Sequence, residues 1–136
     1  MKVYSVEELL ATRVKRANLI SSAGGLRQAL ASASLDRKTD LTLSEALVIG
    51  LIEQGVRTYY SVLGHGSTEI GEVLRVYQNA GLVRVFGLRS EIEASHAAAA
   101  LRWVKGEKAA VVTSIGPGAL QALAASLVPA SNGIGF

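Results

Sequence analysis

The chain alternates between two hydrophobic patterns. Ile70, Val73, Leu74 and Tyr77 follow the spacing i, i+3, i+4, i+7, so they form one apolar stripe and predict a helix over about 68–79. Short runs rich in β-branched and aromatic residues predict strands. These runs are RTYYSVL at 57–63, LVRVFGL at 82–88 and AAVVTSI at 109–115. Further helices are expected over 44–54, 91–104 and 119–128.

Strands that alternate with helices through short connections predict an α/β fold, with a parallel sheet covered by helices on both faces. AAVVTSI is a continuous apolar run, which is typical of a buried parallel strand. Ligands of such sheets bind at the carboxyl ends of the strands. We therefore expect GHGST, GLRSE and TSIGPG to share one functional rim.

Residues 1–40 are expected to be a helical extension and linker outside the main fold. Ser5 and Glu8 have the spacing of a capping box, which predicts a helix from near Val6 to about Ile20. A short helix over 26–33 and the polar linker LDRKTD follow. A second capping box, Thr42 to Glu45, opens the body at 41–136, with Gly55 ending its first helix.

Charge is concentrated in the extension. Residues 1–40 carry seven Lys/Arg and four Asp/Glu, 7 − 4 = +3, and residues 41–136 carry seven of each, which gives zero. Arg13, Lys15 and Arg16 lack interleaved aromatics, so a solvated helix face is favoured over nucleic-acid binding or a transit peptide. The absence of cysteine fits a reducing, cytoplasmic setting, and no apolar run suggests a signal peptide or a membrane span.

The first rim segment, GHGSTEIG, lies between a strand and a helix. A dinucleotide fingerprint needs G-x-G-x-x-G and an acid at the end of the second strand. Here the third glycine is displaced and Arg89, not an acid, follows the second strand, so dinucleotide binding is the weaker interpretation. The segment also lacks the lysine of a Walker phosphate-binding loop. Gly64 and Gly66 suit a tight turn, and His65 between them should face the rim.

The other rim segments carry hydroxyls and a carboxylate. Thr113 and Ser114 end the third run, and Gly116 and Gly118 allow a ligand or backbone to approach, although Ser114 could simply cap the next helix. Glu91 begins a helix, where an acid is ordinarily a surface charge that suits the helix dipole. Glu93 should be solvated. His96 shares a face with Ile92 and Trp103 and is expected in the core.

Two motifs in this region resemble a known family. They are R-x-E-x-x-A-x-H-A-A over 89–98 and T-S-x-G-P-G over 113–118. Together they resemble the pyrimidine-binding domain of thiamine-diphosphate enzymes of the acetolactate-synthase type. The GHG turn and the extra residue Ile115 are closer to the trihydroxycyclohexanedione hydrolase branch. The resemblance covers about residues 41–132.

The resemblance implies a role for each rim segment. Glu91 would hydrogen-bond N1′ of the cofactor's aminopyrimidine. A carboxyl shielded from water can share a proton with that nitrogen. The shared proton would prepare the thiazolium C2 carbon of the cofactor to attack a substrate carbonyl. Gly64, Gly66, Thr113, Ser114 and Gly116 would line the pocket, and His65 would assist proton transfer.

The resemblance also implies what must come from elsewhere. The family binds Mg²⁺ and the diphosphate through a second domain that carries G-D-G and a later Asn, and this sequence has no Asp after Asp40. We therefore expect part of a larger enzyme, with a truncated domain, a diphosphate-binding partner and a homo-oligomeric assembly. Two alternatives remain at this point. One is a non-catalytic interaction or regulatory domain on the same scaffold, and the other is a dinucleotide-binding domain.

Overall fold

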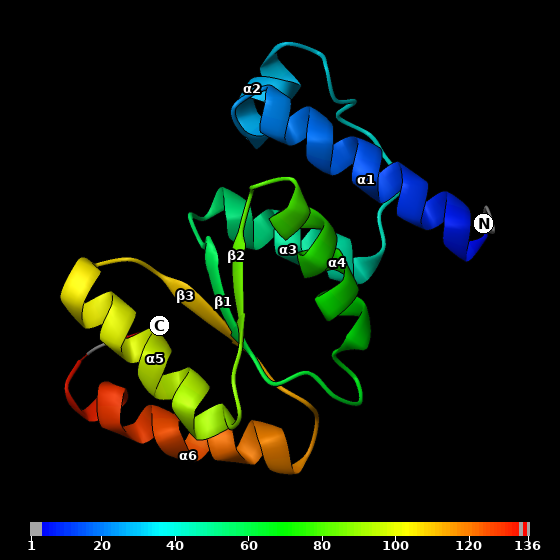
Figure 1. Cartoon of the computed structure of the whole chain (residues 1–136). Coiled ribbons are helices and arrows are strands. Elements are labelled where there is room, and N and C mark those ends of the chain that lie inside the picture. The colour runs from blue at the N-terminus through cyan, green and yellow to red at the C-terminus, as the bar shows by residue number, and fades with distance from the viewer. Residues whose placement is uncertain (1–3, 134, 136) are drawn as a thin grey trace.

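The computed structural model describes residues 4–133 and 135. Its helices and strands follow the predicted alternation (Figure 1). The elements are α1 (Val6–Ser22), α2 (Leu26–Ala31), α3 (Leu43–Glu53), β1 (Thr58–Ser61), α4 (Thr68–Asn79), β2 (Arg84–Gly87), α5 (Glu91–Lys105), β3 (Ala109–Val112) and α6 (Pro117–Ser131). Helix α6 begins two residues earlier than expected, because Pro117 suits the first position of a helix.

The sheet is parallel throughout, as predicted. Its strand order is β2-β1-β3. In the central register Ser61 lies beside Gly87 and Val112, the last residues of their strands. The carboxyl ends of all three strands therefore meet at one edge of the sheet, which we call the rim.

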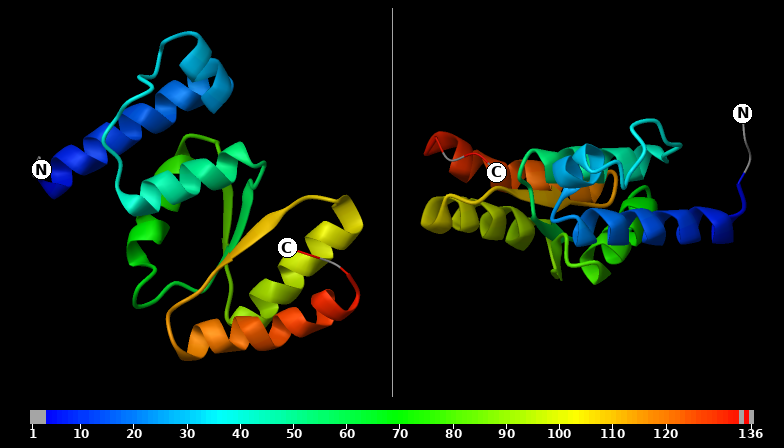
Figure 2. Two further views of the ribbon diagram at one scale, coloured as in Figure 1. Left: turned by 180° about the vertical axis from the view of Figure 1, so that it is seen from behind. Right: turned by 90° about the horizontal axis from the view of Figure 1, so that it is seen from above.

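Helices cover both faces of the sheet. Helices α3 and α4 pack together over one face, whereas α5 packs on β1 and β3 and is flanked by α6 (Figures 1 and 2). The main core lies under α3 and α4, where Tyr59 of β1 and Tyr77 of α4 are fully buried. The other face is packed with small residues, among them Ala94 and Ala98 of α5.

Helix α1 is joined to the body through charged side chains, which corrects the expectation of a solvated face. Arg13 is 5% exposed and Arg16 is 4% exposed. Both approach the buried carboxylate of Glu45, with distances of 2.5 Å from Arg16 Nη1 and 3.7 Å from Arg13 Nε. Ala17 and Ile20 of the same helix belong to the main core. The division of the chain at residue 40 remains a prediction.

The two capping boxes have different outcomes. The first is complete, because Ser5 Oγ accepts from the Glu8 N–H and Glu8 Oε2 accepts from the Ser5 N–H. The second is half formed: Thr42 Oγ1 accepts from the Glu45 N–H at 3.3 Å, but the Glu45 carboxylate turns inward. It accepts instead from Arg16 and from the Tyr77 hydroxyl. A buried guanidinium is the stronger partner for a buried carboxylate.

Two expectations about burial were wrong. The AAVVTSI run was expected to be buried, but β3 is an edge strand in which only Ala109 is buried and the other three residues are half-buried. His96 was expected in the core, but it is exposed together with Ile92 and Trp103. His96 is exposed because α5 turns its small residues, and not its large ones, toward its neighbours.

Candidate functional site

The turn after β1 and the segment after β3 are in direct contact at the rim. A Cβ atom added to Gly64 would lie 2.8 Å from Ser114 Cβ, and one added to Gly66 would lie 2.6 Å from Ile115 Cγ2. The Ile115 N–H donates to the His65 carbonyl at 3.2 Å. Gly66 also has φ +84°, a conformation that favours glycine. The parallel pairing of β1 and β3 therefore brings the predicted glycine turn and the predicted hydroxyl segment together.

A buried serine closes the glycine turn. Ser67 Oγ accepts from the Gly64 N–H at 3.1 Å and lies 3.2 Å from the Gly64 carbonyl, to which it can donate. Sequence reasoning did not single out Ser67, although a serine three residues after the start of a turn is a common closing residue. The closed turn leaves the side chain of His65 exposed.

Glu91 is buried, with only 7% of its surface exposed. It is the first residue of α5, and its burial agrees with the shielded carboxyl that the resemblance implied and not with an ordinary surface charge. Ser90 forms the cap of the helix by accepting from the Glu93 N–H at 3.2 Å. Glu93 is exposed, as predicted, and its carboxylate accepts from the Arg89 N–H at 3.3 Å. Two acids in the same helical turn thus have opposite environments.

The Glu91 carboxylate lies between α5 and the start of α6. A Cβ atom added to Gly118 would lie 2.4 Å from Glu91 Oε1 and 2.4 Å from Ser114 Oγ. Within residues 4–133 and 135, no hydrogen bond or ion pair engages this carboxylate. Ser114 does not cap α6, because the cap is Gly116 and no side chain bonds there. The hydroxyl of Ser114 therefore faces the same small space as the acid.

The other predicted pocket residues, Thr113 and Gly116, occupy different positions on the rim. Thr113 and Gly66 line a mostly apolar hollow of about 240 Å³ between α3, the start of α4 and β3. Gly116 has φ +66° and open space where a side chain would be. The predicted residues therefore form two neighbouring groups. Gly64, Ser114 and Glu91 are linked by close packing, and Gly66 and Thr113 share the hollow.

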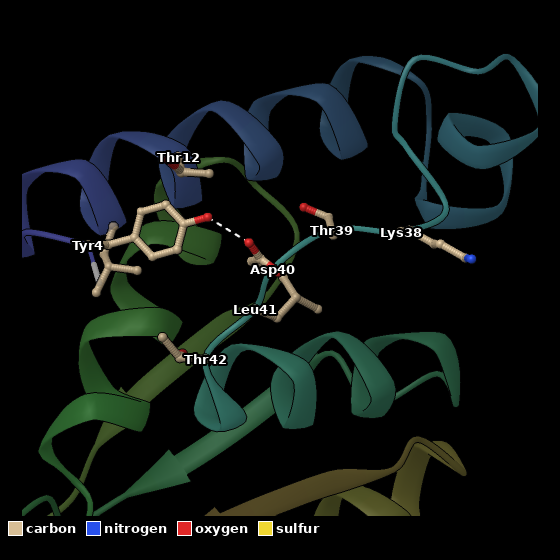
Figure 3. Close-up of a pocket in the computed structure, with 8 residues that line it drawn as sticks. Tyr4, Thr12, Lys38, Thr39, Asp40, Leu41 and Thr42 are labelled. Carbon is tan, nitrogen blue, oxygen red and sulfur yellow. Dashed lines mark hydrogen bonds between the residues drawn. The ribbon is translucent and has the colours of Figure 1, made fainter. Parts of the chain in front are cut away.

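A second hollow, of about 580 Å³, lies away from these residues, between α1 and the segment that precedes α3 (Figure 3). Its lining is Tyr4, Leu9, Thr12, Lys38, Thr39, Asp40, Leu41 and Thr42. The Tyr4 hydroxyl donates to Asp40 Oδ2 at 2.6 Å, and this bond, with a smaller contribution from burial, raises the pKa of Tyr4. None of the residues predicted for the rim lines this hollow.

The described part of the chain has neither a cluster of metal-ligating side chains nor a helix suited to crossing a membrane. No group of three or more His, Asp or Glu side chains there could hold a metal ion. No described helix has both the length and the apolar character that a membrane crossing requires.

The domain is a parallel α/β domain, and in this class ligands bind at the carboxyl ends of the strands, which is the edge where Glu91, Ser114 and the glycine turn lie. The model of the family described as "Thiamine pyrophosphate enzyme, N-terminal TPP binding domain" matches residues 41–133. The chain belongs to this family. No curated protein and no solved structure matches it significantly.

Proposed function

We propose that this chain is the pyrimidine-binding portion of a thiamine-diphosphate enzyme that makes or breaks a C–C bond beside a carbonyl group. The observation that supports the proposal best is the Glu91 carboxylate. It is buried at the rim and lacks a partner among residues 4–133 and 135. Neither of its oxygens is among the fully enclosed side-chain atoms that lack a partner, so the carboxylate stays within reach of a ligand at the rim.

The residues at the rim fit the pyrimidine end of the cofactor. Its ring nitrogen N1′ can share a proton with the acid of Glu91, and the Ser114 hydroxyl lies close to the same acid. Gly64, Gly66, Thr113 and Gly116 would form the surrounding wall. When bound, thiamine diphosphate supplies a carbon nucleophile that attacks the substrate carbonyl and an electron sink for the bond that changes.

The residues of this chain would handle protons and position groups. Glu91 would hold a proton between its carboxyl oxygen and N1′, and its burial would keep water from competing for that proton. His65 is exposed at the rim and could exchange a proton with a substrate, since its imidazole ring carries both a donor and an acceptor nitrogen. The role of His65 ranks below that of Glu91, because only its backbone is tied to the other rim residues.

We propose that Mg²⁺ and the diphosphate are held by a partner domain, within a homo-oligomer. Exposed apolar side chains on α5 and α6 support an interface there, because large exposed apolar patches commonly mark binding surfaces. Trp103 is 77% exposed, Leu120 66% and Leu123 63%.

For the reaction, we rank hydrolysis of a cyclic diketone first and acetolactate-synthase or decarboxylase chemistry second. The ranking rests on the GHG turn and on the extra residue Ile115, which resemble the hydrolase branch of the family. A cytoplasmic location is proposed from the cysteine-free composition.

The test is Glu91→Gln in the native assembly that contains this chain. Glutamine keeps the size of the side chain but cannot exchange a proton in the same way, so activity should fall by roughly 10²–10⁴-fold while folding is retained. Glu93→Gln is the matched control, since Glu93 is exposed in the same turn. Near-normal activity of Glu91→Gln would overturn the assigned role.

Calorimetry separates this proposal from the alternative of a non-catalytic interaction domain. The native assembly is titrated with thiamine diphosphate and Mg²⁺. Heat of binding supports the enzyme. No heat, together with the absence of any associated polypeptide that carries G-D-G and Asn, would favour the non-catalytic domain.

A further inference from the structure

Helix α6 packs along α5, and a buried serine lies at their contact. Ser95 is fully buried, and its Oγ donates to the Glu91 carbonyl at 2.9 Å and lies 3.3 Å from the Ala122 carbonyl of α6. The two helices lie side by side along their length in both views of the fold (Figures 1 and 2). The start of α6 is therefore held close to the residue that carries the buried acid.

Gly118 lies where this contact is closest. The nearest atoms to an added Cβ are Glu91 Oε1 and Ser114 Oγ, each at 2.4 Å, and then Glu91 Cδ at 3.2 Å. The φ angle of Gly118 is not among the positive values, so its backbone conformation is open to any residue. The space, not the backbone, therefore requires glycine at this position.

A methyl group at position 118 would displace side-chain tips and leave the helices in place. The atoms it would meet are the ends of two side chains, whereas the backbones of α5 and α6 are packed along each other. Ordinary contact begins at 3.4 Å, so the Glu91 carboxylate oxygen would have to move by about 3.4 − 2.4 = 1.0 Å. A displacement of about 1 Å in a reacting group can cost on the order of 10²-fold in rate, although it changes stability little.

We propose that Gly118 is a positioning residue that sets where the Glu91 carboxylate meets the pyrimidine ring. The proposal rests on the proposed function of Glu91. Because Gly118 has no side chain, it leaves the space on the α6 side that the Glu91 carboxylate occupies, so the carboxyl oxygen can stay at its place on the rim. The Ser114 hydroxyl, at the same distance from the Gly118 position, bounds the other side of this space.

The test is Gly118→Ala in the native assembly, compared with wild type and with Gly50→Ala. Gly50 lies inside α3 with nothing within 4 Å of an added Cβ, so it controls for the helix-forming effect of alanine. Two quantities are measured: the position of the Glu91 carboxylate in crystal structures, and the hydrogen–deuterium exchange rate at C2 of bound thiamine diphosphate. In Gly118→Ala we expect a carboxylate shift of about 1 Å and exchange about 10²-fold slower. Gly50→Ala should match wild type in both.

A double mutant shows whether the effect passes through the acid. Gly118→Ala should cause no further loss of exchange in a Glu91→Gln background, because the group that it displaces no longer exchanges the proton. If Gly118→Ala does not fold, Ser114→Ala/Gly118→Ala removes one of the two contacts and still places a methyl against Glu91.

The outcomes separate this inference from the proposed function. A wild-type assembly that does not bind thiamine diphosphate overturns both. The second outcome concerns the positioning role alone. If the wild-type assembly exchanges the C2 proton and Gly118→Ala exchanges it at a rate within twofold of wild type, or leaves the Glu91 carboxylate unmoved, the positioning role is overturned and the proposed function stands.

Discussion

Replacing Glu45 with glutamine should destabilise the protein strongly, because Glu45 is the shared anion of two buried arginines. Its carboxylate is 2.5 Å from Arg16 Nη1 and 3.7 Å from Arg13 Nε, and it accepts from the Tyr77 hydroxyl at 3.0 Å. Glutamine preserves the shape but removes the negative charge, so both guanidinium groups would be buried without it. Breaking a buried ion pair by removing one partner costs about 3–5 kcal/mol. That is a large share of the roughly 5–15 kcal/mol by which domains are stable.

The assay is urea unfolding followed by circular dichroism, with the free energy of unfolding obtained by linear extrapolation. Glu69→Gln is the control, because Glu69 also faces Arg13, at 3.5 Å, but its side chain is 54% exposed. The control should lose less than about 1 kcal/mol. Equal losses in the two variants would refute the reasoning that burial makes the Glu45 cluster important.

Replacement of the whole cluster adds a second check of this reasoning. Arg13→Met, Arg16→Met and Glu45→Leu together remove all three buried charges. The triple variant should be far more stable than Glu45→Gln, since apolar replacements of a complete buried ion cluster are often neutral or stabilising. A triple variant less stable than the single one would show that the cluster is needed for more than charge balance.

Two further predictions concern stability. The Tyr59 hydroxyl is buried and has no hydrogen-bond partner among residues 4–133 and 135, so Tyr59→Phe should raise stability by about 1 kcal/mol. Burial raises the pKa of Tyr59 to about 12, above its value of about 10 in the unfolded chain. The stability that this shift contributes is therefore fully present below about pH 10 and is lost as the pH rises toward 12. Thermal unfolding should show that Tyr59→Phe loses less stability than wild type between pH 8 and pH 11. Gly64→Ala should cost about 1–3 kcal/mol in urea unfolding, because its Cβ would meet Ser114 Cβ, which cannot swing aside. An unchanged alkaline loss or a stable Gly64→Ala would contradict these accounts.

The local pattern was sufficient to predict the element order and the rim. The apolar stripe from Ile70 to Tyr77 and the three strand-like runs correspond to α4 and β1–β3, and the strands are parallel as the alternation required. The runs are seven residues long but the strands are four, because the flanking residues leave the ladder to form the turns. Residues that follow strands were placed correctly, since parallel topology brings the ends of neighbouring strands to one edge.

Burial of Arg13, Arg16 and Glu45 was not predicted, although one signal was present. Arg13, Arg16, Ala17 and Ile20 share the spacing i, i+3, i+4, i+7, so the arginines lie on the buried stripe of α1. Their burial depends on Glu45, which is distant in sequence and arrives through the packing of α3. For Glu91, shielding from water was implied only by the family resemblance, because its position in a helical turn does not reveal that α6 covers it.

By itself, the sequence determined the alternation of helices and strands, the parallel α/β class and the motifs of the thiamine-diphosphate family, because these depend on the spacing of neighbouring residues. Only the tertiary structure decided that Arg13, Arg16 and Glu45 form a buried cluster, that Trp103 is exposed, and that Gly118 lies against the carboxylate of Glu91. The physical reason is that exposure depends on the elements that pack above a residue, and those elements come from distant parts of the chain.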